Sequence, residues 1–285
     1  MQMYVRFLRG SGPSLFVRYV QAENARATMI FAHGSMVHSE YYIPFALNLA
    51  GHGISSVLFD FTGHGRSDGI RGHLSDFRRH VEDMLRVVDS TSPAGSILLL
   101  GGESYGALVV WAAFPQIPDT RRPQELLLVS PAFRLRVALT AWQQRGLRNL
   151  ARVWPRFRSP WPMGLAGVSK HPDIEDLVER DPLLCRRYTV GFFVNLLTTE
   201  AQVGTMPIPD VPVMSVLASN DFVVDTEAVR TIVSRLPAPS TIRVIPNSLH
   251  GLCSDHGSEI AREFSRWCVE LGDSSGLKVH PQFGR

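Results

Sequence analysis

The feature that most constrains this chain is a short stretch in which a serine between glycines separates an apolar run from a helix. Residues 97–100 are apolar and have the length of a buried strand. Gly-Glu-Ser-Tyr-Gly follows over residues 102–106, and helix-compatible apolar residues begin at Ala107. A strand, a tight turn and a helix in this order are typical of a nucleophile elbow, which would place Ser104 on a strained turn at the carboxyl end of a sheet.

The neighbours of the serine support this interpretation. Gly102 and Gly106 lack a Cβ, so the strand and the helix can approach each other closely. The backbone N–H of Tyr105 would point to the place where an oxyanion forms on an attacked carbonyl group. The alternative is an ordinary glycine-rich loop with a solvent-exposed serine. We favour the elbow because a buried strand precedes the motif and a helix follows it.

Apolar runs and helical periodicity alternate along most of the chain, which predicts an α/β fold with a parallel sheet and helices on both faces. The strands are expected at residues 4–8, 15–20, 28–32, 55–59, 97–100, 125–129, 213–217 and 241–245. Helices are expected at residues 42–50, from 74 to 88, from 107 onward, at 226–236 and at 258–270. Residues 1–133 and 206–271 would form this core, and the Ser/Gly-containing residues 272–285 are expected to be a disordered tail.

Residues 134–205 have a different composition and are expected to be a helical insertion, or cap. Helix-compatible pieces alternate with Pro155, Pro160, Pro162 and Pro172. Between Arg134 and Arg158 there are seven arginines and no acidic residue, together with Trp142, Trp154 and Phe157. One interpretation is a solvated helical face whose arginine stems cover apolar surface. The other is a positive surface that contacts anionic lipid or a substrate bearing phosphate or carboxylate.

The overall composition excludes several classes of protein. A net charge of +3 without a lysine-rich tract gives no support for nucleic-acid binding. Cys185, Cys253 and Cys268 lie far apart, so neither a zinc site nor a disulfide framework is expected, and their odd number fits a reducing compartment. The N-terminus has no apolar signal region, and no stretch approaches a membrane span. The expectation is a cytoplasmic protein without a metal.

A serine nucleophile needs a histidine base and a carboxylate that orients it, and in a fold with an elbow they follow in the order serine, acid, histidine. Asp221 follows the strand at 213–217 and is the expected acid. Its competitor, Asp225, is expected to cap the next helix. His250 follows the last strand and is the expected base, with His256 as its rival at the start of a helix.

The second oxyanion donor should be a backbone N–H just after the strand at 28–32. Ser35, or failing that Met36, occupies this position in His-Gly-Ser-Met. His33 is expected to pin this loop through hydrogen bonds. Asp60 and His64 are expected to brace a loop, since no metal-binding spacing accompanies them.

Taken together, these motifs resemble one family. His33-Gly-Ser, the ten residues from Asp60 to Gly69, the Gly-x-Ser-x-Gly elbow, Ser219-x-Asp and His250-Gly are similar to the monoglyceride lipase and lysophospholipase-like branch (serine aminopeptidase-type hydrolases) of the α/β-hydrolases. The resemblance covers about residues 15 to 270 and is weakest in the insertion. It implies a mostly parallel eight-stranded sheet with a helical cap between strands six and seven.

The resemblance also implies hydrolysis of a carboxylic ester, such as an acylglycerol or a lysophospholipid, through an acyl-serine and without a cofactor. Ser104, Asp221 and His250 match the family's triad, and Ser35 and Tyr105 match its oxyanion donors. A thioesterase or an acyltransferase would use the same triad. A serine argues against dehalogenases and epoxide hydrolases, which use an aspartate nucleophile. A non-catalytic binding protein on the same scaffold is the alternative from another class.

Overall fold

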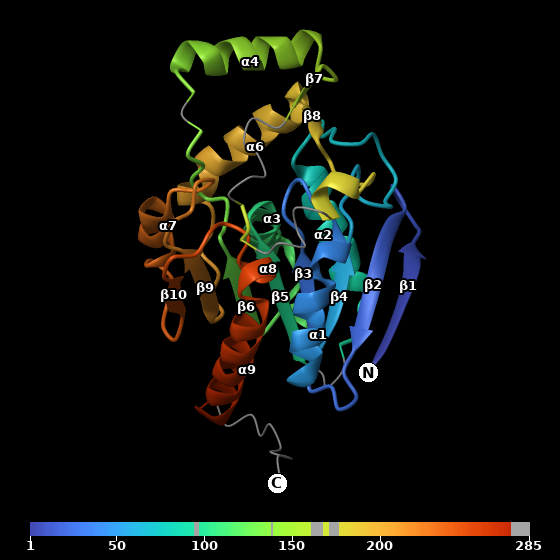
Figure 1. Ribbon diagram of the computed structural model, residues 1–285, viewed down its shortest axis with the longest axis vertical. Coiled ribbons are helices and arrows are strands. Elements are labelled where there is room, and N and C mark those ends of the chain that lie inside the picture. Colours follow the sequence, from blue (N-terminus) through green and yellow to red (C-terminus); the bar gives the residue numbers. More distant parts are fainter. Residues whose placement is uncertain (94–96, 138, 161–167, 171–176, 275–285) are drawn as a thin grey trace.

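A computed structural model describes residues 1–93, 97–137, 139–160, 168–170 and 177–274. An eight-stranded sheet with the order β1-β2-β4-β3-β5-β6-β9-β10 forms the centre of the molecule (Figure 1). The strands are β1 (Gln2–Leu8), β2 (Leu15–Gln21), β3 (Ala27–Ala32), β4 (Ile54–Phe59), β5 (Ile97–Glu103), β6 (Glu125–Val129), β9 (Val213–Ala218) and β10 (Thr241–Ile245). β2 pairs antiparallel with β1 and β4, and the other neighbours are parallel. The predicted mostly parallel sheet is confirmed.

Helices cover both faces of the sheet and create two separate cores. On one face α1 (Ile43–Gly51) packs against α9 (Gly257–Ser274), with α8 (Leu252–Asp255) above them. On the other face α2 (Arg78–Ser90) packs against α3 (Tyr105–Ala113), and α7 (Thr226–Val233) completes this layer. Strands β3, β4 and β9 are buried along their whole length, as expected for parallel strands covered on both sides.

Two helices of the core differ in how they are placed: α3 is buried, and α9 extends to the end of the described residues. Eight of the nine residues of α3 are buried apolar residues or glycine, so this helix lies entirely within the core. Helix α9 continues to Ser274, so residues 272–274, expected to begin the tail, are helical; residues 275–285 lie outside the described residues. Short 3₁₀ turns lie between these elements: η1 (Ser39–Tyr42), η3 (Phe114–Gln116) and η4 (Asp119–Arg121).

The chain between β6 and β9, called the insertion below, adds a separate layer above the carboxyl ends of the strands (Figure 1). It contains α4 (Ala141–Val153), the antiparallel pair β7 (Arg158–Pro160) and β8 (Arg187–Thr189), α6 (Val190–Gln202) and η5 (Val203–Thr205). Thr140 and Gln143 form a capping box that begins α4. Helix α4 packs on α6 and is the outermost element of the molecule (Figure 1). Pro162 and Pro172, which are expected to interrupt the helical pieces, lie outside the described residues.

None of the helices in the described part of the chain combines the length and the apolar character that a bilayer crossing demands.

Candidate active site

Ser104 stands on the turn between β5 and α3 with a backbone φ of 55° and ψ of −116°, a conformation that a serine adopts only when its surroundings enforce it. The surroundings are backbone atoms packed at close range. A Cβ on Gly102 would lie 2.5 Å from the carbonyl carbon of Gly106, and one on Gly106 would lie 2.2 Å from the carbonyl oxygen of Ala32. Only glycine fits at both positions, which is the geometry that the sequence motif predicts.

The structure brings Ser104, His250 and Asp221 together from three separate loops. The Oγ of Ser104 is 2.8 Å from Nε2 of His250, and Nδ1 of His250 is 2.7 Å from Oδ2 of Asp221. All three residues are buried. With Nδ1–H donating to the carboxylate, Nε2 is left to accept the serine hydroxyl proton. The arrangement has the geometry of a serine nucleophile next to a histidine base that a carboxylate orients.

Backbone groups hold the carboxylate of Asp221 in this orientation. Its Oδ1 accepts hydrogen bonds from the N–H groups of Val223 and Val224, at 2.8 and 2.9 Å. The guanidinium Nε of Arg136, from the insertion, donates to the carbonyl oxygen of Asp221 at 2.8 Å. Arg136 is one of the seven arginines expected on a charged surface, and it instead stabilises the loop that carries Asp221.

The two rival residues lie elsewhere. Asp225 is the N-cap of α7, where its carboxylate accepts a hydrogen bond from the N–H of Ala228 at 3.1 Å, as expected for a capping residue. His256 ends α8, and its Nδ1 lies 3.4 Å from the carboxylate of Glu259. Neither contact involves Ser104.

The loop after β3 presents the candidate oxyanion donor. Nδ1 of His33 is 2.6 Å from the carbonyl oxygen of Gly34, and its Nε2 accepts a hydrogen bond from the N–H of Phe61 at 3.1 Å. The second contact leaves the proton on Nδ1, which therefore donates to Gly34 and fixes the peptide plane that carries the N–H of Ser35. Burial lowers the pKa of His33 to about 3, so the imidazole is neutral at pH 7.

Among the described residues, no protein group accepts a hydrogen bond from the N–H of Ser35 or of Tyr105. Met36, the alternative donor, has its carbonyl group bonded to the N–H of Cys185 in the insertion, at 2.9 Å.

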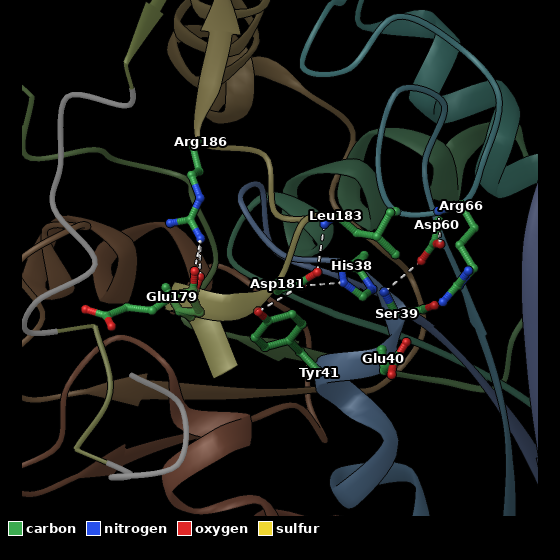
Figure 2. Close-up of polar contacts among 12 residues, drawn as sticks. His38, Ser39, Glu40, Tyr41, Asp60, Arg66, Glu179, Asp181, Leu183 and Arg186 are labelled. Carbon is green, nitrogen blue, oxygen red and sulfur yellow. Dashed lines mark hydrogen bonds and ion pairs between the residues drawn. The ribbon is translucent and has the colours of Figure 1, made fainter. Parts of the chain in front are cut away.

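Asp60 and His64 brace the loop that follows β4, as predicted. The two carboxylate oxygens of Asp60 accept hydrogen bonds from the N–H groups of Ser39 and Arg66, both at 2.8 Å (Figure 2). His64 lies 3.1 Å from the hydroxyl of Tyr188, and burial holds its pKa well below the usual range. Within the described residues, no three or more His, Cys, Asp or Glu side chains gather in a way that could hold a metal ion.

A second buried network supports the side chain of Tyr105, next to the nucleophile. Nε2 of His80 is 2.9 Å from the carbonyl oxygen of Thr62, and its Nδ1 is 2.7 Å from the Tyr105 hydroxyl. Asp83 accepts hydrogen bonds from the N–H and the hydroxyl of Thr62, at 2.8 and 3.0 Å. Burial lowers the pKa of His80 to about 3 and raises that of Asp83 to about 6.

Residues 181–189, called the return segment below, contact the loop after β3 that carries the candidate oxyanion donor, called the oxyanion loop below. Oδ2 of Asp181 is 2.8 Å from Nε2 of His38 and accepts a hydrogen bond from the Tyr41 hydroxyl at 3.0 Å, while Oδ1 accepts one from the N–H of Leu183 at 2.7 Å (Figure 2). The Tyr188 hydroxyl donates to the carbonyl oxygen of Ser35. The insertion is thus hydrogen-bonded directly to the loop that carries the candidate oxyanion donor.

Comparison with known proteins places the chain in a family. The model of the family described as serine aminopeptidase, S33, matches residues 23–257. The chain belongs to this family. Relatives of the chain include the human monoglyceride lipase, 26% identical over 288 residues, which covers 96% of this chain and 93% of that protein.

Two solved structures share the fold of this S33 member. A monoacylglycerol lipase of Paleococcus ferrophilus has a TM-score of 0.79 at 22% identity and covers 90% of this chain and 98% of its own. A soluble variant of the Saccharomyces cerevisiae monoglyceride lipase has a TM-score of 0.82 at 16% identity, with 94% and 95% covered. The predicted α/β-hydrolase fold and the enzyme class, a carboxylic-ester hydrolase, are confirmed.

Sequence reasoning missed three contributors to this S33 site. The first is Glu103, inside the elbow motif itself. The second is Arg136, and the third is the return segment with Asp181 and Tyr188. For Glu103 a signal existed, because a charged residue next to the nucleophile in a buried strand needs polar partners.

Proposed function

We propose that this chain hydrolyses carboxylic esters with Ser104 as nucleophile, His250 as base and Asp221 as the residue that orients the base. The continuous hydrogen-bonded chain from Asp221 through His250 to Ser104 carries the proposal. His250 takes the hydroxyl proton while Oγ attacks the carbonyl carbon. The N–H groups of Ser35 and Tyr105 stabilise the oxyanion, and neither has a protein acceptor among the described residues.

The reaction then continues through an acyl-serine. The imidazolium of His250 gives its proton to the leaving alcohol, and the acyl group stays on Oγ. Water, deprotonated by the same imidazole, attacks the acyl carbon and releases the fatty acid. We propose single-chain acyl esters as substrates, either monoacylglycerols or lysophospholipids, because relatives that match 96% of the chain are named monoglyceride lipases and another that matches 72% of it is named a phospholipase.

The test combines covalent labelling with product analysis. A fluorophosphonate probe should label the wild type at Ser104, and Ser104→Ala should lose labelling together with ester turnover, by on the order of 10³-fold or more in kcat. Monooleoylglycerol, lysophosphatidylcholine and an oleoyl thioester then rank the substrate classes. Preferred turnover of the thioester, or transfer to an added alcohol instead of water, would point to the thioesterase or acyltransferase alternative. Ester turnover by Ser104→Ala at the wild-type rate would refute the assignment of the nucleophile.

We further propose that the exposed side of α4 docks on an anionic lipid surface. Helix α4 has no buried residue, and Trp142 and Val153 are 73% and 86% exposed. They lie eleven positions apart, about three helical turns, so they share one face. Arg145, Arg148 and Arg152 are exposed beside this face. Apolar side chains that enter the interface next to arginines that meet phosphate headgroups are typical of membrane-surface helices.

Vesicle sedimentation tests this docking. Vesicles with phosphatidylglycerol should bind the wild type, binding should weaken between 0.1 and 1 M salt, and pure phosphatidylcholine should bind less. The variant with Arg145, Arg148 and Arg152 changed to Gln should lose most of the difference between the two lipids. Arg243→Gln, at an exposed arginine on β10 that pairs with Glu259, is the control. Equal binding to both vesicle types would leave α4 as a solvated surface.

A further inference from the structure

Glu103, the residue immediately before the nucleophile, is a buried carboxylate with defined partners. It is 6% exposed. Its Oε2 accepts a hydrogen bond from the hydroxyl of Tyr42 at 2.8 Å, and its Oε1 accepts one from the backbone N–H of Cys253 at 2.8 Å. The hydroxyl of Tyr42 in turn accepts a hydrogen bond from the N–H of Gly34 at 2.9 Å. Both oxygens of the carboxylate are therefore engaged, and each points to a different part of the site.

These partners come from the loops that the proposed reaction needs. Gly34 directly precedes Ser35 in the oxyanion loop, and Cys253 lies three residues after His250. Glu103 itself belongs to the elbow, because it is the last residue of β5. One side chain thus connects the nucleophile, the histidine loop and the oxyanion loop, three segments that are far apart in the sequence.

We propose that Glu103 is a positioning residue that holds the oxyanion loop and the histidine loop in register with Ser104, and that its negative charge stabilises the protonated form of His250. The proposal rests on the proposed function, since it assigns a role within that reaction. Hydrogen bonds to a carboxylate are stronger than hydrogen bonds between neutral groups. A single buried Glu can therefore hold two loops more tightly than a neutral side chain would.

The electrostatic half of the proposal follows from the groups around the carboxylate. Burial raises the pKa of Glu103, while the Cys253 N–H, the charge of His250 and the Tyr42 hydroxyl act in the opposite direction. Tyr42 and Cys253 also face the carboxylate, and burial raises the pKa of each far above neutrality, so both stay uncharged. Because both of its oxygens accept hydrogen bonds, from the Tyr42 hydroxyl and the Cys253 N–H, the geometry suits the ionised carboxylate, an anion in addition to Asp221 that can favour the imidazolium formed during catalysis.

The decisive variant is Glu103→Gln, which keeps the shape and removes the charge. We expect kcat to fall by roughly 10- to 100-fold with KM changed less than about twofold, because the loops and the imidazolium matter most in the transition state. The acid limb of the kcat/KM pH profile should move to lower pH by roughly half a unit, because the protonated imidazole loses a nearby anion. If Glu103 only held the loops in place, the acid limb of the pH profile would stay where it is in the wild type.

Two further variants separate the two halves of the proposal. Tyr42→Phe breaks the link to Gly34 and retains the charge, so kcat should fall while the acid limb stays in place. Glu125→Gln is the matched control: Glu125 is a partly buried carboxylate at the start of β6, paired in register with Leu99 rather than with Glu103, and both kcat and the pH profile should be unchanged.

The rate of fluorophosphonate labelling gives a readout that does not depend on the substrate. Loss of labelling rate in Glu103→Gln supports the positioning role even if none of the tested esters is turned over, an outcome that would count only against the proposed substrates. Wild-type labelling, kcat and pH profile in Glu103→Gln would overturn the inference while leaving Ser104 as nucleophile.

Discussion

Asp221 and Asp225 lie four positions apart, and their different surroundings give them different roles. Asp221 accepts from His250, whereas Asp225 accepts from the first turn of α7. Asp221→Asn should lower kcat by about 10³- to 10⁴-fold, because an amide no longer selects the tautomer of the imidazole. Asp225→Asn should leave kcat unchanged, since Asn caps helices as well as Asp does. Steady-state kinetics of the two variants, checked by thermal melts, distinguish them; similar losses in both would contradict our assignment of the acid.

The sequence reveals the parts of the site that local spacing encodes. Ser104 follows from the glycines beside it, and Asp221 and His250 follow from strand order. Glu103 and Arg136 could not be assigned in this way. The partner of Glu103 in the histidine loop is 150 positions away in the chain, and Arg136 contacts an aspartate 85 positions away. Such pairings depend on how loops converge in three dimensions, which periodicity does not record.

Strands and helices also differ in how well the sequence predicts them. All eight strands of the sheet were predictable within a few residues. The buried parallel strands are continuous apolar runs bounded by turn residues, whereas β1 is exposed and pairs antiparallel with β2. The insertion was recognisable only as helical. Helix α4 has no buried residue, so its position on the outside of the molecule could not be predicted from its apolar residues, and the three-residue strands β7 and β8 are too short to leave a pattern.

The contact between the return segment and η1 should matter for both stability and activity. Asp181→Ala leaves His38 and Tyr41 without their acceptor and should cost about 2–4 kcal/mol in the free energy of unfolding. It should also lower kcat, because the oxyanion loop is loosened. Urea unfolding and ester kinetics measure the two effects. Glu179→Ala is the matched control, since Glu179 is exposed and Arg186 contacts only its carbonyl oxygen (Figure 2). Equal effects of the two variants would contradict this coupling.

Across the whole molecule, buried imidazoles link folding to pH. Burial holds the pKa of His33 and of His80 at about 3 and that of His64 well below its usual range. An unfolded histidine binds a proton below about pH 6.5, and the folded one does not, so the stability that each contributes is present above pH 6.5 and is lost as the pH falls toward 3. Asp83, whose pKa burial raises to about 6, acts in the opposite direction over the same range.

Replacing His80 separates its contribution to the free energy of unfolding from those of the other buried histidines. His80→Gln should destabilise the protein at pH 7.5, because two buried hydrogen bonds are disturbed. The difference from the wild type should shrink by roughly 2 kcal/mol at pH 5, because the wild type alone loses the contribution of His80 below pH 6.5. Urea unfolding at several pH values provides the measurement. A difference that stays constant between pH 7.5 and pH 5 would mean that His80 is not held neutral in the folded protein.

The return segment also decides how this enzyme can be recombined with its relatives. Thr189 donates its N–H to the carbonyl of Gly72, and Arg71 donates to that of Leu183, in addition to the contacts of Asp181 and Cys185. These residues of the return segment belong to the insertion in the sequence, but they are hydrogen-bonded to loops of the core. A chimera that exchanged the whole stretch between β6 and β9 would replace one half of each of these pairs. A graft confined to α4 leaves these pairs and the contact of Arg136 with Asp221 intact, so it would transfer the helix that we propose to face lipid while keeping the hydrogen bonds around the candidate active site.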